Sequence, residues 1–318
     1  MFQVNSGFKM KNITAIIIAL NEEQFVDICI SAIYDFVQRI VVVTNYDTDY
    51  SGKIVSPDST VSKILSFKDT GRKIVLIAYR DIKDEVIQRN WAMSADLELS
   101  KVAGSRILPH EYPFDEIKKS YPKTEYFWII DADEIYDPET IPGIIDFVYK
   151  SNSDAVAIRG FNHFQKWNYR ISPKTDYFSQ IGFLRAGKTF WARRVLYHPR
   201  VLGWAHHINP WLSQKLIALY KNQIALPERI GVFYHGSYVG DTERIKKKMF
   251  SSSHLREIGK DAAEAWIRDV WEGWTPESKN FFFKNKPGAF SEVEVIPTSS
   301  LPKVIKNALW PADWILPD

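Results

Sequence analysis

The sequence predicts an α/β protein with a doubly wound, mostly parallel β-sheet, and two features carry this prediction. Over about the first 160 of the 318 residues, short apolar runs alternate with segments whose apolar residues recur every three or four positions. The runs are apolar at successive positions, as in strands that are buried on both faces. The composition agrees, because 45% hydrophobic and 25% charged residues are typical of a globular chain.

The elements follow in order from these patterns. Residues 13–20 predict a strand, and Asn21 is the expected N-cap of a helix whose apolar residues recur as far as Phe36. Residues 40–43 predict the next strand, which a polar turn ends. The alternation then predicts a helix at 61–67, a strand at 74–79, a helix at 84–97 and a strand at 126–130, and it extends as far as residues 155–160. Because strands and helices alternate, neighbouring strands are expected to pair in parallel.

After residue 160 the alternation gives way to aromatic, loop-rich sequence. We therefore expect an α/β domain over residues 1–160 and a second region over residues 161–318. In the second region, residues 190–196 and 231–233 are candidate strands, and residues 241–258 and 262–271 are expected to be helical. The tail from about residue 286 contains prolines and is expected to be irregular.

Charge and cysteine content narrow the classes of partner and compartment. The chain has 41 Lys and Arg against 38 Asp and Glu, a net charge of +3, so no strong overall field favours nucleic acid or membrane. The single cysteine, Cys29, cannot form an intramolecular disulfide, and the first ten residues lack the pattern of a signal peptide. A cytoplasmic location is therefore expected. No apolar run approaches the length of a transmembrane segment.

Three acids follow the strand at residues 126–130 within four positions: Asp131, Asp133 and Glu134. In doubly wound sheets, ligands bind outside the carboxyl ends of the strands. Placing this much like charge in such a crevice is costly unless a cation is present, and carboxylate oxygens are ligands that Mn²⁺ and Mg²⁺ prefer. The sequence therefore predicts a divalent metal here. The alternative is that the acids cap a following helix.

Several segments together resemble the GT-A nucleotide-sugar glycosyltransferases, most closely family 2. The resemblance rests on Asn21-Glu22-Glu23, Thr48-Asp49, Gln88-Arg89-Asn90 and Asp131-Ala132-Asp133. The acid that the family carries after its second strand is replaced here by Thr44 or Asn45. The resemblance implies a GT-A-type sheet, with residues 1–160 binding the nucleotide sugar and residues 161–318 forming an aromatic-rich acceptor region with C-terminal helices.

The resemblance also implies roles for individual residues. The expected nucleotide-sugar ligands are Asn21, Glu22, Asn45, Asp49, Arg89 and Asp131, and the expected metal ligands are Asp131, Asp133 and His235. Two plainer interpretations stay open, in which Arg89 is an exposed helix cation and His235 is a structural histidine. The run Lys246 to Lys248 is expected to lie on a solvated helix face.

Three residues of the second region are candidates for the catalytic base. Related transferases carry an acid after a histidine, where this chain has His206 and then His207. A neutral imidazole can accept a proton near pH 7, so His207, His206 and the carboxylate of Asp176 are the candidates. Four tryptophans are expected to line an acceptor cleft or to belong to the core: Trp167, Trp191, Trp204 and Trp211.

The residues and the resemblance together predict a metal-dependent glycosyltransferase that moves a sugar from a nucleotide diphosphate sugar to an acceptor hydroxyl. The resemblance implies that this transfer proceeds with inversion. A glycan acceptor is preferred because the net charge is only +3. A hydroxylated base in DNA stays open as acceptor, because cations cluster near Trp191 and Trp204: Arg185, Lys188, Arg193, Arg194 and Arg200. A sugar-phosphate nucleotidyltransferase would want a glycine-rich loop after the first strand, which residues 20–23 lack. A non-catalytic binding module is opposed by the intact Asp131-Ala132-Asp133.

Overall fold

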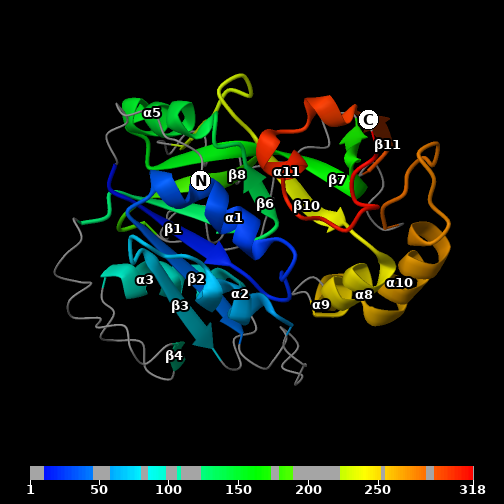
Figure 1. Ribbon diagram of the computed structural model, residues 1–318, viewed down its shortest axis with the longest axis horizontal. Helices are drawn as coiled ribbons and strands as arrows, with labels where there is room; N and C mark the ends of the chain where they lie inside the picture. Colours follow the sequence, from blue (N-terminus) through cyan, green and yellow to red (C-terminus); the bar gives the residue numbers. More distant parts are fainter. Residues whose placement is uncertain are drawn as a thin grey trace, which may run out of the picture.

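The computed structural model describes residues 11–45, 58–79, 85–97, 106–108, 123–172, 179–188, 223–251, 255–283 and 290–317. It has an α/β fold built on one large sheet (Figure 1). The strands are β1 (Ile13–Ile18), β2 (Arg39–Asn45), β3 (Ile74–Tyr79), β4 (Arg106–Leu108), β5 (Tyr126–Asp131), β6 (Glu134–Tyr136), β7 (Ala155–Ser172), β8 (Ser179–Arg185), β9 (Gln223–Ala225), β10 (Phe233–Val239) and β11 (Glu292–Val295). The helices include α1 (Val26–Ile33), α2 (Thr60–Ser66), α3 (Glu85–Leu97), α5 (Ile141–Ser151), α8 (Thr242–Ser251), α9 (Leu255–Ile258), α10 (Lys260–Trp266) and α11 (Lys303–Lys306).

The parallel centre of the sheet confirms the predicted fold class. β1 pairs in parallel with β2 and with β5, and β2 pairs in parallel with β3. Ile16 lies between its partners Val41 and Ile129, and all three side chains are buried. Beyond β5 and β3 the pairing becomes mixed, because β8 and β4 run antiparallel to their neighbours.

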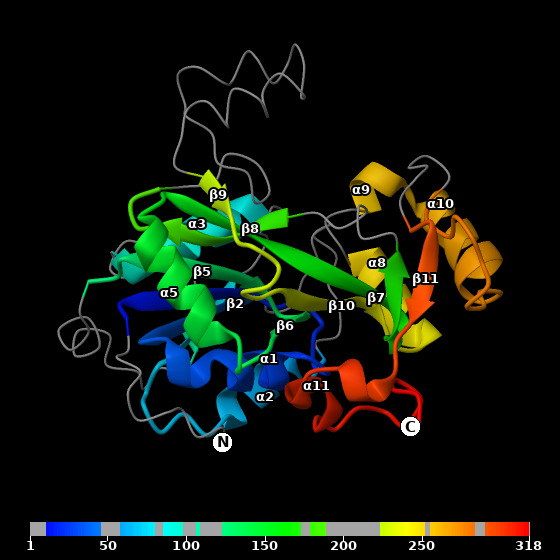
Figure 2. The same cartoon turned by 90° about the horizontal axis from the view of Figure 1, so that it is seen from above.

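Helices cover both faces of this centre, as a doubly wound sheet requires. Figure 2 shows α1 and α2 on one side of the strands and α3 on the other. Ile17 of β1 belongs to the core cluster that includes Ile30 of α1, whereas Ile16 packs in a second cluster with Met93 of α3. Successive residues of β1 therefore bury on opposite faces, which explains its uninterrupted apolar sequence.

Strand β7 joins the two halves of the molecule. It has 18 residues, and it pairs antiparallel with β8, parallel with β10 and antiparallel with β11. The expected boundary after residue 160 falls inside this strand. The prediction of an irregular tail was wrong in part, because β11 adds a strand to the far end of β7 and α11 follows it.

Much of the aromatic sequence of the second half packs into a core rather than onto a surface. A cluster around Phe164 contains Trp266, Trp271, Trp274, Phe281, Phe283 and Phe290, all of them buried. Trp167 is also fully buried, with its ring 5.4 Å from that of Trp310, so for this residue the core interpretation holds. Trp191, Trp204 and Trp211 lie outside the described residues. No helix within the described residues has the length and apolar character needed to cross a membrane.

Candidate active site

The carboxyl ends of β1, β2 and β5 lie side by side. The acidic segment, Asp131 to Glu134, begins at the end of β5. Ile18 is the register partner of both Val43 and Asp131. The N–H of Ala132 donates to the carbonyl oxygen of Ile18 over 2.9 Å. The residues that follow β1 and β5 are therefore neighbours, at the edge where open α/β sheets bind ligands.

Strand β10 brings His235 to Asp133. The N–H of Gly236 donates to the carbonyl oxygen of Asp133 over 2.8 Å, and His235 Nε2 lies 3.5 Å from Asp133 Oδ1. On the other side of the ring, His235 Nδ1 lies 2.6 Å from Asn162 Oδ1. Because an amide oxygen only accepts hydrogen bonds, Nδ1 is protonated and donates a hydrogen bond to Asn162 Oδ1. The second ring nitrogen, Nε2, therefore faces the carboxylate.

The charges of this pair support each other. Burial disfavours the charged form of His235, but the Asp133 carboxylate outweighs burial and raises the pKa of His235 above its ordinary value. Burial likewise opposes ionisation of Asp133, which is 3% exposed. Lys248 and His235 reverse that effect and hold the pKa of Asp133 well below its usual range. Asp133 is thus a carboxylate at neutral pH.

Lys248 of α8 lies between two carboxylates. Its Nζ is 2.5 Å from Asp133 Oδ2 and 2.5 Å from Glu22 Oε1. Arg244, one helical turn earlier, reaches the other Glu22 oxygen over 3.1 Å. Burial nevertheless raises the pKa of Glu22. Helix α8 is therefore anchored by ion pairs to the segment that follows β1.

Asn21 also contacts α8, and it is not the helix N-cap that the sequence predicted. Its φ of 56° is left-handed, a conformation that asparagine tolerates, and α1 begins only at Val26. The Asn21 side-chain amide donates to Ser251 Oγ over 3.3 Å. The next residue, Glu22, donates its backbone N–H to Thr60 Oγ1 over 2.9 Å. A tight turn thus points both side chains toward α8.

Asp131 is held by Arg89 rather than by the Asp133 cluster. The Arg89 guanidinium lies 2.8 Å from Asp131 Oδ1 and 3.2 Å from Glu85, which is four residues earlier in α3. Arg89 is 2% exposed, so the interpretation of an exposed helix cation was wrong. Glu134, fully buried, accepts the backbone N–H of Asp131 over 3.2 Å and stabilises the turn.

The predicted site residues therefore divide into three sets. The structure brings Glu22 and Asp133 together through Lys248, and it places His235 directly against Asp133. It places Asp131 with Arg89, and Asn21 with Ser251. Asn45 is the last residue of β2, and its side chain is not among the parts that the structure describes. Four other predicted site residues lie outside the described residues: Asp49, Asp176, His206 and His207.

The metal prediction can be compared with these positions. Within the described part of the chain, no three His, Cys, Asp or Glu side chains are grouped so as to hold an ion. Two ligands suffice for Mn²⁺ or Mg²⁺, which commonly take one or two protein ligands and complete the shell with phosphate oxygens and water. Neighbouring ligands of an octahedral ion lie about 3 Å apart. The 3.5 Å between Asp133 Oδ1 and His235 Nε2 is close to that spacing, so this pair fits such an ion.

Sequence reasoning missed three residues of this cluster: Asn162, Arg244 and Lys248. Lys248 was assigned to a solvated face, but its side chain is only 22% exposed, whereas that of Lys246 is 41% exposed and Lys247 is exposed. A signal was available for two of them, because Arg244 and Lys248 are four residues apart and lie one position from the buried Ile245 and Met249. Asn162 has no comparable signal.

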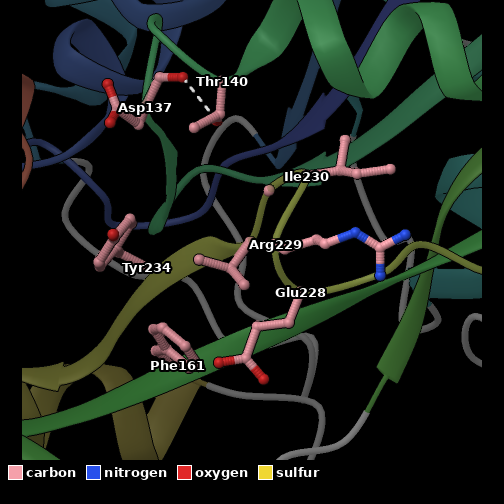
Figure 3. Close-up of a pocket in the computed structure, with 9 residues that line it drawn as sticks. Asp137, Thr140, Phe161, Glu228, Arg229, Ile230 and Tyr234 are labelled. Atoms are coloured by element: carbon pink, nitrogen blue, oxygen red, sulfur yellow. Dashed lines mark hydrogen bonds between the residues drawn. The ribbon is translucent and has the colours of Figure 1, made fainter.

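A separate cavity of about 230 Å³ lies near the beginning of α5 (Figure 3). Its lining includes Asp137, Phe161, Glu228 and Tyr234. Tyr234 precedes His235 in β10, and successive side chains of a strand point to opposite faces. The cavity is therefore on the other side of β10 from Asp133, and none of the predicted site residues lines it.

Comparison with known proteins gives a distant result. No family model matches the chain, and no curated protein matches it. Among solved structures, S. aureus TarS 1–349 shares 13% identity over 81% of this chain and 69% of that one, with a TM-score of 0.42. The TarS 1–349 complex with UDP gives 14% identity over 81% and 69%, with a TM-score of 0.41. The complex with UDP-GlcNAc matches over 48% of this chain and only 35% of that chain, with 14% identity and a TM-score of 0.32. These values assign no family.

Proposed function

We propose that the protein is a glycosyltransferase that moves a sugar from a nucleotide diphosphate sugar to an acceptor hydroxyl. The observation that carries the proposal is the buried pair of Asp133 and His235 at the carboxyl end of a parallel sheet. His235 has Nδ1 held by Asn162 and Nε2 directed at the carboxylate, which is the arrangement of a metal-binding histidine. This is the edge at which such sheets bind nucleotides.

The residues of the site have separate tasks in this proposal. Asp133 and His235 hold a divalent cation, Mn²⁺ or Mg²⁺, and Asp131 binds the donor ribose or that cation. When bound, such an ion supplies positive charge that stabilises the diphosphate as it leaves. Arg89 has two tasks, because it contacts the nucleotide and also holds Asp131 in place over 2.8 Å. Asn162 fixes the tautomer and orientation of His235.

The acceptor is proposed to be a glycan hydroxyl, attacked in one inverting displacement. The low net charge of +3 supports a neutral acceptor over a polyanion. The proton of that hydroxyl would pass to His207, His206 or Asp176, none of which is among the described residues.

A thermal-shift screen tests the donor. The full chain is heated with uridine, guanosine, cytidine, adenosine and thymidine diphosphate sugars, each with Mn²⁺, with Mg²⁺ and with EDTA. A ligand that binds only the folded state raises Tm, by an amount that grows with its concentration. We expect one nucleotide class to raise Tm with the metal and to do so much less with EDTA.

Two results would contradict the proposal. One is the absence of any nucleotide sugar that raises Tm. The other is release of pyrophosphate from a nucleoside triphosphate and a sugar phosphate, which is the reaction of a nucleotidyltransferase. Slow release of free sugar from the donor that binds, dependent on Mn²⁺ and lost in Asp133→Asn, would support the transferase.

A further inference from the structure

The cation that the structure itself places at Asp133 is the Lys248 ammonium. Its Nζ lies 2.5 Å from Asp133 Oδ2 and 2.5 Å from Glu22 Oε1. The Asp133 and Glu22 side chains are 4% and 8% exposed, and that of Lys248 is 22% exposed. Lys248 is therefore the more accessible partner in a nearly buried ion pair, and the negative charge of Asp133 is already neutralised.

We propose that Lys248 is the resident counter-charge of Asp133 and that a divalent cation has to displace it in order to bind there. The inference rests on the proposed function, in that it takes Asp133 and His235 as the ligands of that ion. It concerns how tightly the site holds the ion, which the choice of ligands alone does not decide.

The geometry favours displacement over joint occupancy. An ion between Asp133 Oδ1 and His235 Nε2 would sit on the same carboxylate that Lys248 contacts through Oδ2. An ammonium and a divalent ion on one carboxylate repel each other, and partial burial weakens the screening by water. Lys248 has a second carboxylate to retain, because Glu22 Oε1 accepts from the same Nζ. The ammonium can therefore leave Asp133 without becoming unpaired.

Metal affinity tests the inference without any nucleotide sugar. Mn²⁺ alone is titrated into the metal-free full chain, and free Mn²⁺ is followed by electron paramagnetic resonance. We expect Lys248→Met to bind Mn²⁺ at least about tenfold more tightly than the unaltered chain. Lys247→Met is the matched control, because it removes the same charge from an exposed position of the same helix. It should leave the affinity unchanged within about twofold.

A double-mutant cycle locates the effect. In an Asp133→Asn background, Lys248→Met should no longer change Mn²⁺ affinity, because the Asp133 carboxylate for which Lys248 and Mn²⁺ compete has gone. Unchanged or weaker Mn²⁺ binding by Lys248→Met, including no binding by either protein, would overturn the inference. So would a gain that persists in the Asp133→Asn background.

A second measurement uses the unaltered chain and so does not depend on how well a variant folds. Lysines are acetylated with acetic anhydride, and the modification at each position is measured by mass spectrometry. Mn²⁺ should raise the labelling rate of Lys248 several-fold and leave that of Lys247 unchanged. Equal labelling of Lys248 with and without Mn²⁺ would overturn the displacement. If Lys248 behaves as expected and no nucleotide sugar binds, the proposed function fails while this inference stands.

Discussion

Asn162 is the residue that decides which nitrogen of His235 faces the carboxylate. It is 2% exposed, and its Oδ1 lies 2.6 Å from His235 Nδ1. Removing the acceptor leaves the tautomer and the ring orientation of His235 undefined. We therefore expect Asn162→Ala to lower Mn²⁺ affinity by about 10- to 100-fold, the usual cost of losing a group that orients a metal ligand. Calorimetric titration with Mn²⁺ measures it.

Asn168 provides the control, since it is equally buried in the same strand. Its amide donates to the Ile296 carbonyl oxygen over 3.0 Å and to Thr298 Oγ1 over 2.9 Å. Asn168→Ala should lower Tm without a specific loss of Mn²⁺ affinity. Equal losses of affinity in both variants would mean that Asn162 supports only the fold.

A second prediction at the scale of residues concerns Arg89 and the free energy of unfolding. Its guanidinium is buried and pairs with Asp131 and Glu85. Removing one partner of a buried ion pair leaves the other without compensation, which typically costs about 3–5 kcal/mol. Asp131 and Glu85 keep 28% and 25% exposure, so we expect the lower end, about 3 kcal/mol, for Arg89→Met. Urea unfolding measures this free energy.

An exposed pair shows what burial adds. Lys150 and Asp146 are also four residues apart in a helix, but their side chains are 76% and 59% exposed. Lys150→Met should change the unfolding free energy by no more than about 0.5 kcal/mol. A loss for Arg89→Met as small as that for Lys150→Met would show that the Arg89 pair is solvent-screened.

At the scale of elements, the position of β10 depends on Gly236. A Cβ added there would lie 2.3 Å from a ring carbon of Phe25 and 2.9 Å from one of Trp167, and both rings are fully buried. Gly236→Ala must therefore push β10 away from its neighbours, which we expect to cost about 1–3 kcal/mol. Because His235 precedes this residue, Mn²⁺ affinity should fall as well.

The control for that substitution is Gly273→Ala, since an added Cβ at Gly273 meets no atom within 4 Å. We expect Gly273→Ala to change stability by less than about 0.5 kcal/mol and to leave metal binding intact. Urea unfolding and Mn²⁺ titration are run on both variants. Wild-type stability in Gly236→Ala would show that β10 and the aromatic rings relax at no cost.

The elements themselves were predictable to different degrees. The strands of the parallel centre were anticipated because each is buried on both faces, which leaves a continuous apolar run such as residues 13–18. The length of β7 and the presence of β11 were not predicted from the sequence. Glu292 and Glu294 alternate with Val293 and Val295 over only four residues, and such a short pattern becomes a strand only because the edge of β7 is available.

At the scale of the whole molecule, His163 makes the free energy of unfolding depend on pH. The side chain is fully buried beside Trp167, and burial lowers its pKa to about 3, whereas an unfolded histidine titrates near 6.5. The unfolded chain therefore binds more protons between these values. The contribution of neutral His163 is fully present above about pH 6.5 and is lost as the pH falls toward 3.

His163→Phe should remove this part of the acid sensitivity. Urea unfolding free energies are measured for both proteins from pH 8 to pH 4. Below about pH 6.5 the unaltered chain should lose stability more steeply than the variant, by up to about 1.4 kcal/mol per pH unit. Between pH 7 and 8 the difference between the two proteins should be constant. Parallel curves over the whole range would show that His163 titrates normally.

The sequence by itself determined the alternating strands and helices of the first half and the place of Asp131 and Asp133 at a strand end. Both follow from local patterns, since burial on two faces and the carboxyl end of a strand are legible within a few residues. Even there, the cap at Asn21 was wrong, because a left-handed turn stabilised by Ser251 replaces it.

Only the tertiary structure decided which charges meet. Lys248 and Glu22 are 226 positions apart, and Lys248 and Asp133 are 115 apart. Three successive lysines look alike in sequence, and the direction of each depends on how α8 rotates against β1 and β10. That rotation is set by the burial of Ile245 and Met249 and by the ion pair of Arg244. The electrostatic energy of a site depends on distances between distant segments, and these distances exist only once the chain has packed.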